Sequence, residues 1–469
     1  MGFYDNFDEK MYKLQGTKEM KEIQKYKLKE RVDWARSSQN PMISMIFQNL
    51  NPDSLTLLED LKKAIPVLDQ NVLRGGMGGA PSVAEKGEVE KGKMVKTMAL
   101  IQGVDQYDFK LLCGTGGTTG EPTPYFFTRE GIELAYKGVA RMMWMVSGES
   151  YDNLRRMRVA NAFAFSVWVT GTLMTMALIE NDVGVIPITA EAGRERLIDF
   201  CKRWGANVLG CTPSYAEHLV DTNLEDIKKI GFERVVCGAE AGAGIPEVRR
   251  KIMDGFGCPV TDLMGLVFGM SLVSCDSGYE YLGMHNLSDD FMMIELVDAE
   301  TNEAVSFEDG AIGKMVVVPL IPGFPPVRFS SGDIIQVFTS PCRCGHPGFR
   351  MQVIGRADDM LKVRGAMVYP NAVDSVISSF YPRVTGEFRI VLTSPPPHVE
   401  PPLKLKVEYD KGVKDEELEP LAREIGERMH NRLSVRPQIQ WVPPGSISEV
   451  VRGPAMKTKF IEKAYEEKK

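Results

Sequence analysis

The feature that most constrains the fold is an alternation of apolar segments with helical patterns between about residues 160 and 237. Residues 183–188 and 206–211 are short, largely apolar runs, and residues 234–237 form a third. A helical pattern over residues 191–204 separates the first two runs, and another precedes the third. Strands that are apolar along their whole length are typical of a parallel sheet covered by helices on both faces. The sequence therefore predicts an α/β core.

The pattern changes twice after this core. Residues 312–340 resemble β-hairpins, which predicts a mixed sheet, and after residue 358 the alternation starts again. The later elements are strands near 388–392, 403–409 and 438–442 and a helix over 415–433. They form an α+β unit of roughly a hundred residues, which is large enough to fold by itself. We therefore expect a large N-terminal domain, residues 1–357, with parallel and mixed sheets covered by helices, and a small C-terminal domain, residues 358–469.

Composition excludes several classes of protein. A hydrophobic fraction of 43% and a charged fraction of 25% are ordinary for a soluble globular chain. A net charge of −7 argues against a nucleic-acid surface. The first eight residues do not form a signal peptide, and no run of about 20 apolar residues could span a membrane. We expect a cytoplasmic protein with no membrane partner, whose eight cysteines are thiols or metal ligands rather than disulfides.

A Gly- and Thr-rich loop occupies residues 111–123. Leu111 and Leu112 are predicted to end a buried strand, and the rest of the segment is dominated by Gly and Thr. Exposed backbone N–H groups and hydroxyls can surround an anion, and phosphate is the usual one. The alternative is a flexible surface turn, because a single Gly-rich loop is a weak motif.

Three further segments carry polar groups at positions suited to binding. Residues 237–240 follow a strand directly, where parallel sheets bind ligands. Residues 328–333 place Asp333 after a tight turn, which suits a ribose diol, and residues 355–365 place charges and glycines between the two predicted domains. Each could be an ordinary turn, but their joint occurrence in this order is hard to explain by chance.

The order of these segments resembles that of the adenylate-forming enzymes, and within them the phenylacetate–CoA ligase branch. The resemblance runs from about residue 80 to the C-terminus and is carried by residues 115–123, 238–240, 262–266, 332–333 and 355–365. It implies the AMP-binding fold with a mobile C-terminal domain, and a two-step reaction. ATP, with Mg²⁺, and a carboxylate give an acyl-adenylate and pyrophosphate, and coenzyme A then displaces AMP.

The resemblance also implies roles for individual residues. The phosphate cradle would consist of Thr115, Gly116, Gly117, Thr118, Thr119 and Gly120. The adenine site would be lined by Ala239, Glu240 and Asp262, and the ribose would meet Asp333 with Arg356 nearby. Asp358 would be the hinge of the C-terminal domain, and Gly365 would lie beside the pantetheine channel.

A C-terminal lysine should approach the carboxylate and the α-phosphate during adenylation, where it would offset developing negative charge. The usual spacing after Arg452 points to Lys457. Lys459 is a neighbouring candidate, and a basic helix start is the alternative interpretation.

The acyl pocket is expected on residues 161–168, where relatives have aromatic and small residues. Phe163, Phe165 and Trp168 could pack against an aryl ring, with Met264 nearby. The alternative is that these side chains belong to the ordinary core.

Three cysteines and a histidine predict a second site. Cys275, His285, Cys342 and Cys344 would make a closed tetrahedral zinc site of structural character, and His346 competes as the fourth ligand. The spacing is not that of a standard zinc finger, but some relatives in the same branch have matching residues. The remaining cysteines lie in apolar runs and are expected to be buried thiols, namely Cys113, Cys201, Cys211, Cys237 and Cys258.

The chain departs from the family pattern at three positions. Val267 replaces a hydroxyl residue, Phe268 replaces the carboxylate that would hold Mg²⁺, and Glu121 replaces a lysine. The apolar pair would enlarge the acyl site and favour a bulky aromatic acid. An aryl–CoA ligase is the first interpretation. An adenylyltransferase that transfers AMP to a cofactor hydroxyl and a non-catalytic nucleotide-binding protein stay open, as does a homodimer.

Overall fold

The computed structural model describes residues 2–38, 41–53, 58–68, 95–96, 99, 102, 104–115, 123–265, 267–322, 324–447 and 460–465. It begins with helices α1 (Phe3–Asn6), α2 (Glu9–Leu14), α3 (Lys18–Arg36), α4 (Pro41–Phe47) and α5 (Leu58–Ala64). In the described part of the chain, no helix is both long and apolar enough to cross a bilayer.

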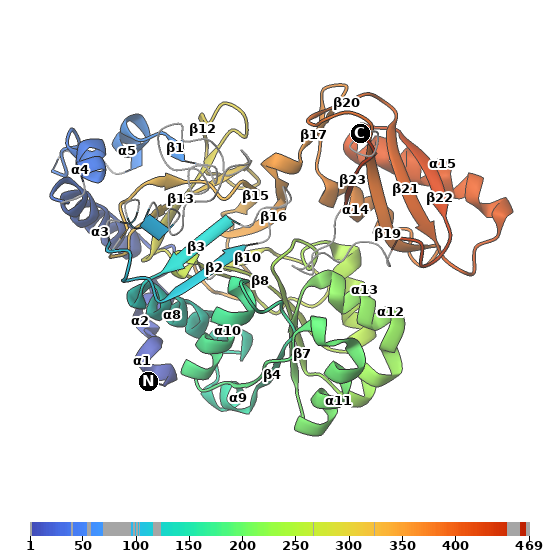
Figure 1. Ribbon diagram of the computed structural model, residues 1–469, viewed down its shortest axis with the longest axis horizontal. Helices are drawn as coiled ribbons and strands as arrows, with labels where there is room; N and C mark the ends of the chain where they lie inside the picture. The colour runs from blue at the N-terminus through green and yellow to red at the C-terminus, as the bar shows by residue number, and fades with distance from the viewer. Residues whose placement is uncertain are drawn as a thin grey trace.

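The predicted parallel core is present and defines the green region of Figure 1. Its strands run in the order β5 (Gly184–Ile186), β4 (Arg158–Asn161), β6 (Val208–Cys211), β7 (Arg234–Gly238) and β8 (Val260–Gly265), all parallel. The sequence pattern missed β4, whose first residue is an exposed arginine. It also began one helix too early, because a short 3-10 turn, Ala190–Ala192, precedes α11 (Arg194–Trp204).

Helices cover both faces of this sheet, as the apolar strands predict. Val208 packs into the core beneath α8 (Arg129–Val146) and α10 (Val169–Glu180), whereas its neighbour Leu209 faces α11, α12 (Pro213–Ile230) and α13 (Pro246–Phe256). Successive side chains point to opposite faces of a strand, so a strand between two helical layers must be apolar at every position. A short helix, α9 (Tyr151–Arg156), precedes β4.

Beyond β8 the neighbouring strands of the same sheet pair antiparallel, except that β1 and β14 are parallel. It continues through β9 (Ser271–Ser274), β10 (Met284–Asn286), β16 (Arg350–Arg356), β15 (Asp333–Phe338), β13 (Ile312–Pro319), β14 (Arg328–Phe329) and β1 (Val67–Leu68), with β11 (Met292–Val297) and β12 (Ala304–Val305) paired off β13. Within the described residues, strand β1 and strands β4 to β16 make one 14-stranded mixed sheet. The expected hairpin region is confirmed, because β13 and β15 pair antiparallel.

The C-terminal elements form sheets of their own (orange to red in Figure 1). One contains β18 (Ala366–Val368), β17 (Leu361–Val363) and β20 (His398–Val399); the other contains β22 (Pro437–Val442), β21 (Leu403–Tyr409), β19 (Val384–Leu392) and β23 (Ile461–Lys463). With α14 (Pro370–Ser378) and α15 (Asp415–Leu433) they enclose a separate apolar core. The α/β fold class is confirmed. The boundary predicted between residues 357 and 358 falls inside a 3-10 turn, Ala357–Asp359.

Candidate active site and a candidate metal centre

A cavity of about 250 Å³ opens at the carboxyl ends of β7 and β8, where the parallel and antiparallel parts of the sheet meet. The cavity brings together eight of the predicted site residues, which are Phe163, Trp168, Ala239, Glu240, Asp262, Met264, Asp333 and Arg356. The ends of parallel strands are the usual ligand-binding edge of an open α/β sheet. Sequence segments that are far apart therefore converge on one concave site.

The Gly- and Thr-rich loop begins at this cavity. Strand β2 (Leu111–Thr115) pairs antiparallel with β3 (Thr123–Phe127), and β2 continues past the two leucines that were predicted to end it. Gly114 lines the cavity and forms a bridge with Trp168. The backbone of Thr115 continues the strand, whereas Gly116, Gly117, Thr118, Thr119 and Gly120, together with Glu121, lie outside the described residues.

The turn after β7 directs two residues into the cavity. Ala239 has a φ of 67°, in the left-handed region that a residue with a side chain rarely adopts. Strain of this kind concentrates at functional sites, where the surrounding fold enforces it. The carboxylate of Glu240 accepts a 2.9 Å hydrogen bond from the backbone N–H of Ser214, at the N-terminus of α12. Part of the role of Glu240 is therefore to cap this helix.

Asp262 lies on β8 and is buried. Its backbone N–H donates to Ser274 Oγ at 2.9 Å, and Tyr281 Oη donates to its Oδ2 at 2.7 Å. Burial raises the pKa of the Asp262 carboxyl to about 6, while the hydrogen bond from Tyr281 and the charge of Arg249 act in the opposite direction. Tyr281 and Arg249 were not predicted, because no local pattern connects either residue with β8.

Asp333, Arg356 and the predicted hinge residue Asp358 form one ionic cluster. Arg356 donates to both carboxylate oxygens of Asp358, at 2.9 and 3.1 Å, and reaches Asp333 Oδ1 at 3.3 Å. Ser331 also donates to Asp333. These carboxylates raise the pKa of the Arg356 guanidinium against the effect of burial. The first residue of β15 and the last residue of β16 are thus connected to the turn that precedes the C-terminal sheets.

The remaining wall of the cavity is apolar. Phe163, Trp168 and Met264 line it as predicted, whereas Phe165 is half-buried and is not among its lining residues. Val267 also lines it. Sequence reasoning missed the apolar side chains supplied by the antiparallel strands and the loops beside them, which are Met270, Met284, Met315, Val317 and Phe329.

The predicted residue Gly365 is not among the residues that line the cavity. Gly365 and Arg364 form the two-residue turn between β17 and β18, with φ values of 84° and 49°. Positive φ at both positions is what a tight hairpin turn requires. An added Cβ at Gly365 would meet no atom within 4 Å. Lys457 and its neighbour Lys459 lie outside the described residues.

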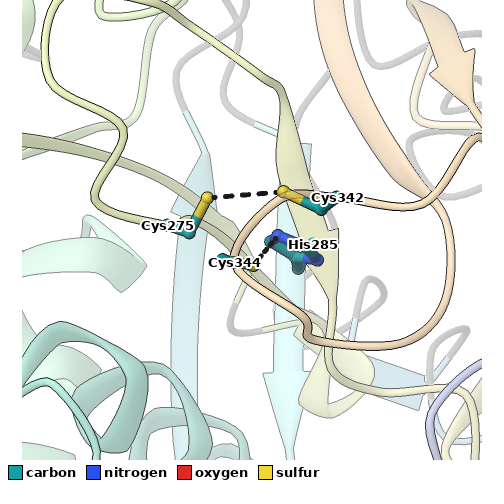
Figure 2. A group of neighbouring side chains, drawn as sticks. All are labelled: Cys275, His285, Cys342 and Cys344. Carbon is teal, nitrogen blue, oxygen red and sulfur yellow. Dashed lines mark hydrogen bonds between the residues drawn. The ribbon is translucent and has the colours of Figure 1, made fainter.

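The four predicted metal ligands converge in a second cluster (Figure 2). Their ligand atoms all lie within 4.8 Å of one another. Cys275 follows β9, His285 lies on β10, and Cys342 and Cys344 lie in the loop between β15 and β16. Because β10 pairs with both β9 and β16, the sheet order brings these segments together.

The spacing of these atoms matches a tetrahedral zinc ion. Cys275 Sγ lies 3.8 Å from Cys342 Sγ, and Cys344 Sγ lies 3.3 Å from His285 Nε2. Zinc–sulfur bonds of about 2.3 Å at a tetrahedral centre separate two sulfurs by about 3.8 Å. Burial lowers the pKa of His285 to about 3, which favours the neutral ring that a metal requires. The competing residue, His346, instead packs edge-on against His285 at 5.2 Å between ring centroids.

Comparison with known proteins agrees with this architecture. Residues 365–459 match the family model of the AMP-binding enzyme C-terminal domain. The chain is 28% identical over 322 residues to a phenylacetate-coenzyme A ligase of Thermus thermophilus, covering 67% of each protein. It is 24% identical over 388 residues to a phenylacetate-coenzyme A ligase of Pseudomonas putida, covering 80% of each.

Solved structures show the same fold over almost the whole chain. A 2-hydroxyisobutyryl-CoA ligase in its postadenylation state, 22% identical in sequence, matches 97% of this chain and 92% of its own with a TM-score of 0.78. In its thioesterification state the same ligase matches with a TM-score of 0.61. The resemblance read from the sequence is confirmed: the chain is similar to phenylacetate-coenzyme A ligases, and its residues 365–459 match the C-terminal domain of AMP-binding enzymes.

Proposed function

We propose that this protein is an ATP-dependent acid–CoA ligase that forms an acyl-adenylate and then an acyl-CoA thioester, and that its acid is aromatic. The observation that carries the proposal is that one cavity contains both polar and apolar residues. Asp262, Asp333 and Arg356 share it with an apolar wall that includes Phe163 and Met264. A carboxylate oxygen is a poor leaving group and AMP is a good one. A site that binds a nucleotide beside an apolar acid therefore suits the two-step reaction.

The polar side of the cavity would bind the nucleotide. Asp333 would accept hydrogen bonds from the ribose hydroxyls, with its orientation fixed by Ser331 and Arg356. Ala239, Glu240 and Asp262 would surround the base. The loop after Gly114 would hold the β- and γ-phosphates through its backbone N–H groups and hydroxyls. With the nucleotide bound in this way, its α-phosphate would face the acid. Adenylation needs this proximity between the two reacting groups.

The apolar side of the cavity would bind the acid. Phe163 and Trp168 provide aromatic faces, and aromatic rings gain energy from offset or edge contacts. Met264, Met270, Met284 and Met315 add flexible, polarisable side chains that adapt to irregular shapes. Val267, at a position where the family pattern has a hydroxyl, makes this wall more apolar still. These features support an aryl acid as large as phenylacetate or larger.

Three further roles belong to the same proposal. With Asp262 facing the base, Glu240 is the carboxylate of the cavity available to hold Mg²⁺, which would neutralise charge on the departing pyrophosphate. Lys457 would act in adenylation, and rotation about Asp358 would bring Gly365 to the pantetheine arm for transfer to CoA. The cysteine and histidine cluster would hold a structural zinc ion. Its three thiols, of which only Cys344 is exposed, and the neutral imidazole fit that ion, which would crosslink three separate segments of the sheet.

The decisive experiment is a carboxylate panel assayed for AMP formation with and without CoA. We expect CoA-dependent AMP release with aryl acids and little with acetate. Transfer of AMP to a cofactor hydroxyl, at a rate that does not depend on CoA, would instead support an adenylyltransferase. No acid-dependent pyrophosphate exchange at all would support a non-catalytic nucleotide-binding protein, the alternative suggested by Val267 and Phe268 in place of the family's hydroxyl and carboxylate residues. A preference for short aliphatic acids would contradict the aromatic assignment alone.

A further inference from the structure

Two side chains outside the cavity lining, the half-buried Tyr281 and the buried Arg249, act on Asp262. Neither residue lines the cavity, whereas Asp262 does. The Tyr281 hydroxyl donates to Asp262 Oδ2 at 2.7 Å. The Arg249 guanidinium lies 5.8 Å from the centroid of the Tyr281 ring and interacts electrostatically with Asp262.

Arg249 is an unusual group to bury. Its side chain is 0% exposed, and its Nε donates to the carbonyl of Gly278 at 3.0 Å. Its two terminal nitrogens, Nη1 and Nη2, have no hydrogen-bond partner among the residues that the structure describes. A buried cation with so few partners is costly, so a compensating role is expected. Asp262 is the acidic group that acts most strongly on Arg249, and Asp276 also contributes negative charge.

The ring of Tyr281 is held in place by the loop that contains Gly244. Its ring packs against the backbone of Gly244, where an added Cβ would lie 2.9 Å from the ring. Gly244 itself lines the cavity, as does Ala239 at the start of the same loop. The ring therefore supports the cavity loop while its hydroxyl holds one oxygen of Asp262. This arrangement leaves Oδ1 as the oxygen not engaged by Tyr281.

The protonation state of Asp262 decides what its carboxyl group can recognise. An ionised carboxylate only accepts hydrogen bonds, so it pairs with the 6-amino group of adenine and opposes a 6-oxo group. A protonated carboxyl can donate to a 6-oxo purine. Burial favours protonation, and the neighbouring Cys237 and Glu240 do not supply positive charge. The hydrogen bond from Tyr281 and the charge of Arg249 oppose it.

We propose that Tyr281 and Arg249 are positioning residues that keep the Asp262 carboxylate ionised and oriented toward the base, and so set a preference for 6-amino over 6-oxo purine nucleotides. The inference rests on the proposed function, because it takes the cavity beside Asp262 as the nucleotide site. It goes further by assigning the base selectivity to two residues outside the cavity lining.

The test compares binding of ATP and ITP, which differ in having a 6-amino or a 6-oxo group, by calorimetric titration across pH. For Tyr281→Phe we expect the ATP-to-ITP affinity ratio to fall roughly tenfold, the size expected for one hydrogen bond to a charged group. The acidic limb of the ATP-binding profile should move to higher pH. Arg249→Met should lower the affinity ratio and shift the acidic limb in the same direction. Arg249→Lys should keep part of the preference for ATP, because lysine retains the positive charge.

The chain offers a matched control pair. Arg250 lies 5.9 Å from the ring centroid of Tyr279, whose hydroxyl donates to Asp254, so this exposed pair repeats the same chemistry away from the cavity. Tyr279→Phe and Arg250→Met should leave the ratio and the pH profile unchanged. In an Asp262→Asn background, Tyr281→Phe should have no further effect on the ATP-to-ITP affinity ratio. If Tyr281 had a merely structural role, its loss would still change nucleotide binding in that background.

The outcomes separate the two proposals. Failure of the wild-type protein to bind either nucleotide would overturn the proposed function. Normal ATP binding by the wild type, with an unchanged ratio and profile in Tyr281→Phe, would overturn this inference and leave the function standing. If Arg249→Met does not fold, as judged by circular dichroism, Tyr281→Phe and Arg249→Lys decide the question.

Discussion

Arg356 holds Asp358 in a two-pronged ion pair, with its Nε and Nη2 at 2.9 and 3.1 Å from the two carboxylate oxygens. Arg356 ends β16 in the large sheet, and Asp358 lies in the 3-10 turn that precedes β17. The third nitrogen of the same guanidinium reaches Asp333 at 3.3 Å. A residue beside the proposed ribose site is therefore connected through one side chain to the proposed hinge.

The first prediction concerns this pair. Asp358→Ala should change the transfer to CoA by more than it changes adenylate formation, because it alters the turn and leaves the contact between Arg356 and Asp333. Its effect on unfolding should be below about 1 kcal/mol, since the pair is partly exposed. Single-turnover assays of each half-reaction measure the split. An equal loss in both half-reactions would contradict a hinge role.

The second prediction concerns the ribose. Asp333→Asn should raise the KM for ATP roughly tenfold while the KM for the acid stays close to its original value, because a charged acceptor has been replaced by a neutral one. Steady-state kinetics with each substrate varied in turn provide the measurement. Asp226→Asn is the control, because its carboxylate forms an exposed ion pair with Lys202 and neither residue lines the cavity. A similar KM change in both variants would argue against the assignment.

The third prediction concerns the metal cluster. The purified protein should contain one zinc per chain by elemental analysis, and Cys342→Ser should lose it and lower the melting temperature. Chelation should produce the same destabilisation, since a structural zinc ion contributes folding free energy directly. Cys258→Ser is the control for metal content, because this buried thiol lies outside the cluster. Retention of zinc by Cys342→Ser would show that the metal is held elsewhere.

The fourth prediction concerns pH and the contact between the two parts of the chain. Burial raises the pKa of Glu217 on α12 to about 7, although Lys251 Nζ lies 3.6 Å away. Asp221 on the same helix, Glu240, and Glu387 from β19 add negative charge around it. Between about pH 4 and 7 the folded protein therefore keeps a proton that the unfolded chain has lost. Stability should fall as the pH rises through this window.

The difference in unfolding free energy between pH 5 and pH 8 due to Glu217 is at most about 3 kcal/mol, from the size of this shift. Denaturant unfolding of the wild type and of Glu217→Gln at both pH values measures it. The variant should lose this part of the pH dependence and be more stable than the wild type at pH 8. Glu225→Gln, at an exposed position on the same helix, should not. Parallel pH profiles for wild type and Glu217→Gln would refute the assignment.

The sequence by itself determined the local elements and the general place of the site. The helix predicted over 415–433 matches α15, because its length and amphipathic period are local properties. Residues 237–240 were assigned to the site because the ends of parallel strands share one edge of a sheet. The positions of three cysteines and a histidine, together with matching residues in relatives of the same branch, predicted the four residues that the structure brings together.

Only the tertiary structure decided which distant segments face one another. Tyr281 reaches Asp262, Met315 joins Met264 in the cavity wall, and Cys275 meets Cys342 across 67 residues of chain. These contacts depend on the strand order of the mixed sheet, in which β10 lies between β9 and β16. Hydrophobic periodicity reports which face of an element is buried but not which element covers it. The partners of Asp262 therefore followed from the packing of the sheet and not from the pattern of residues along it.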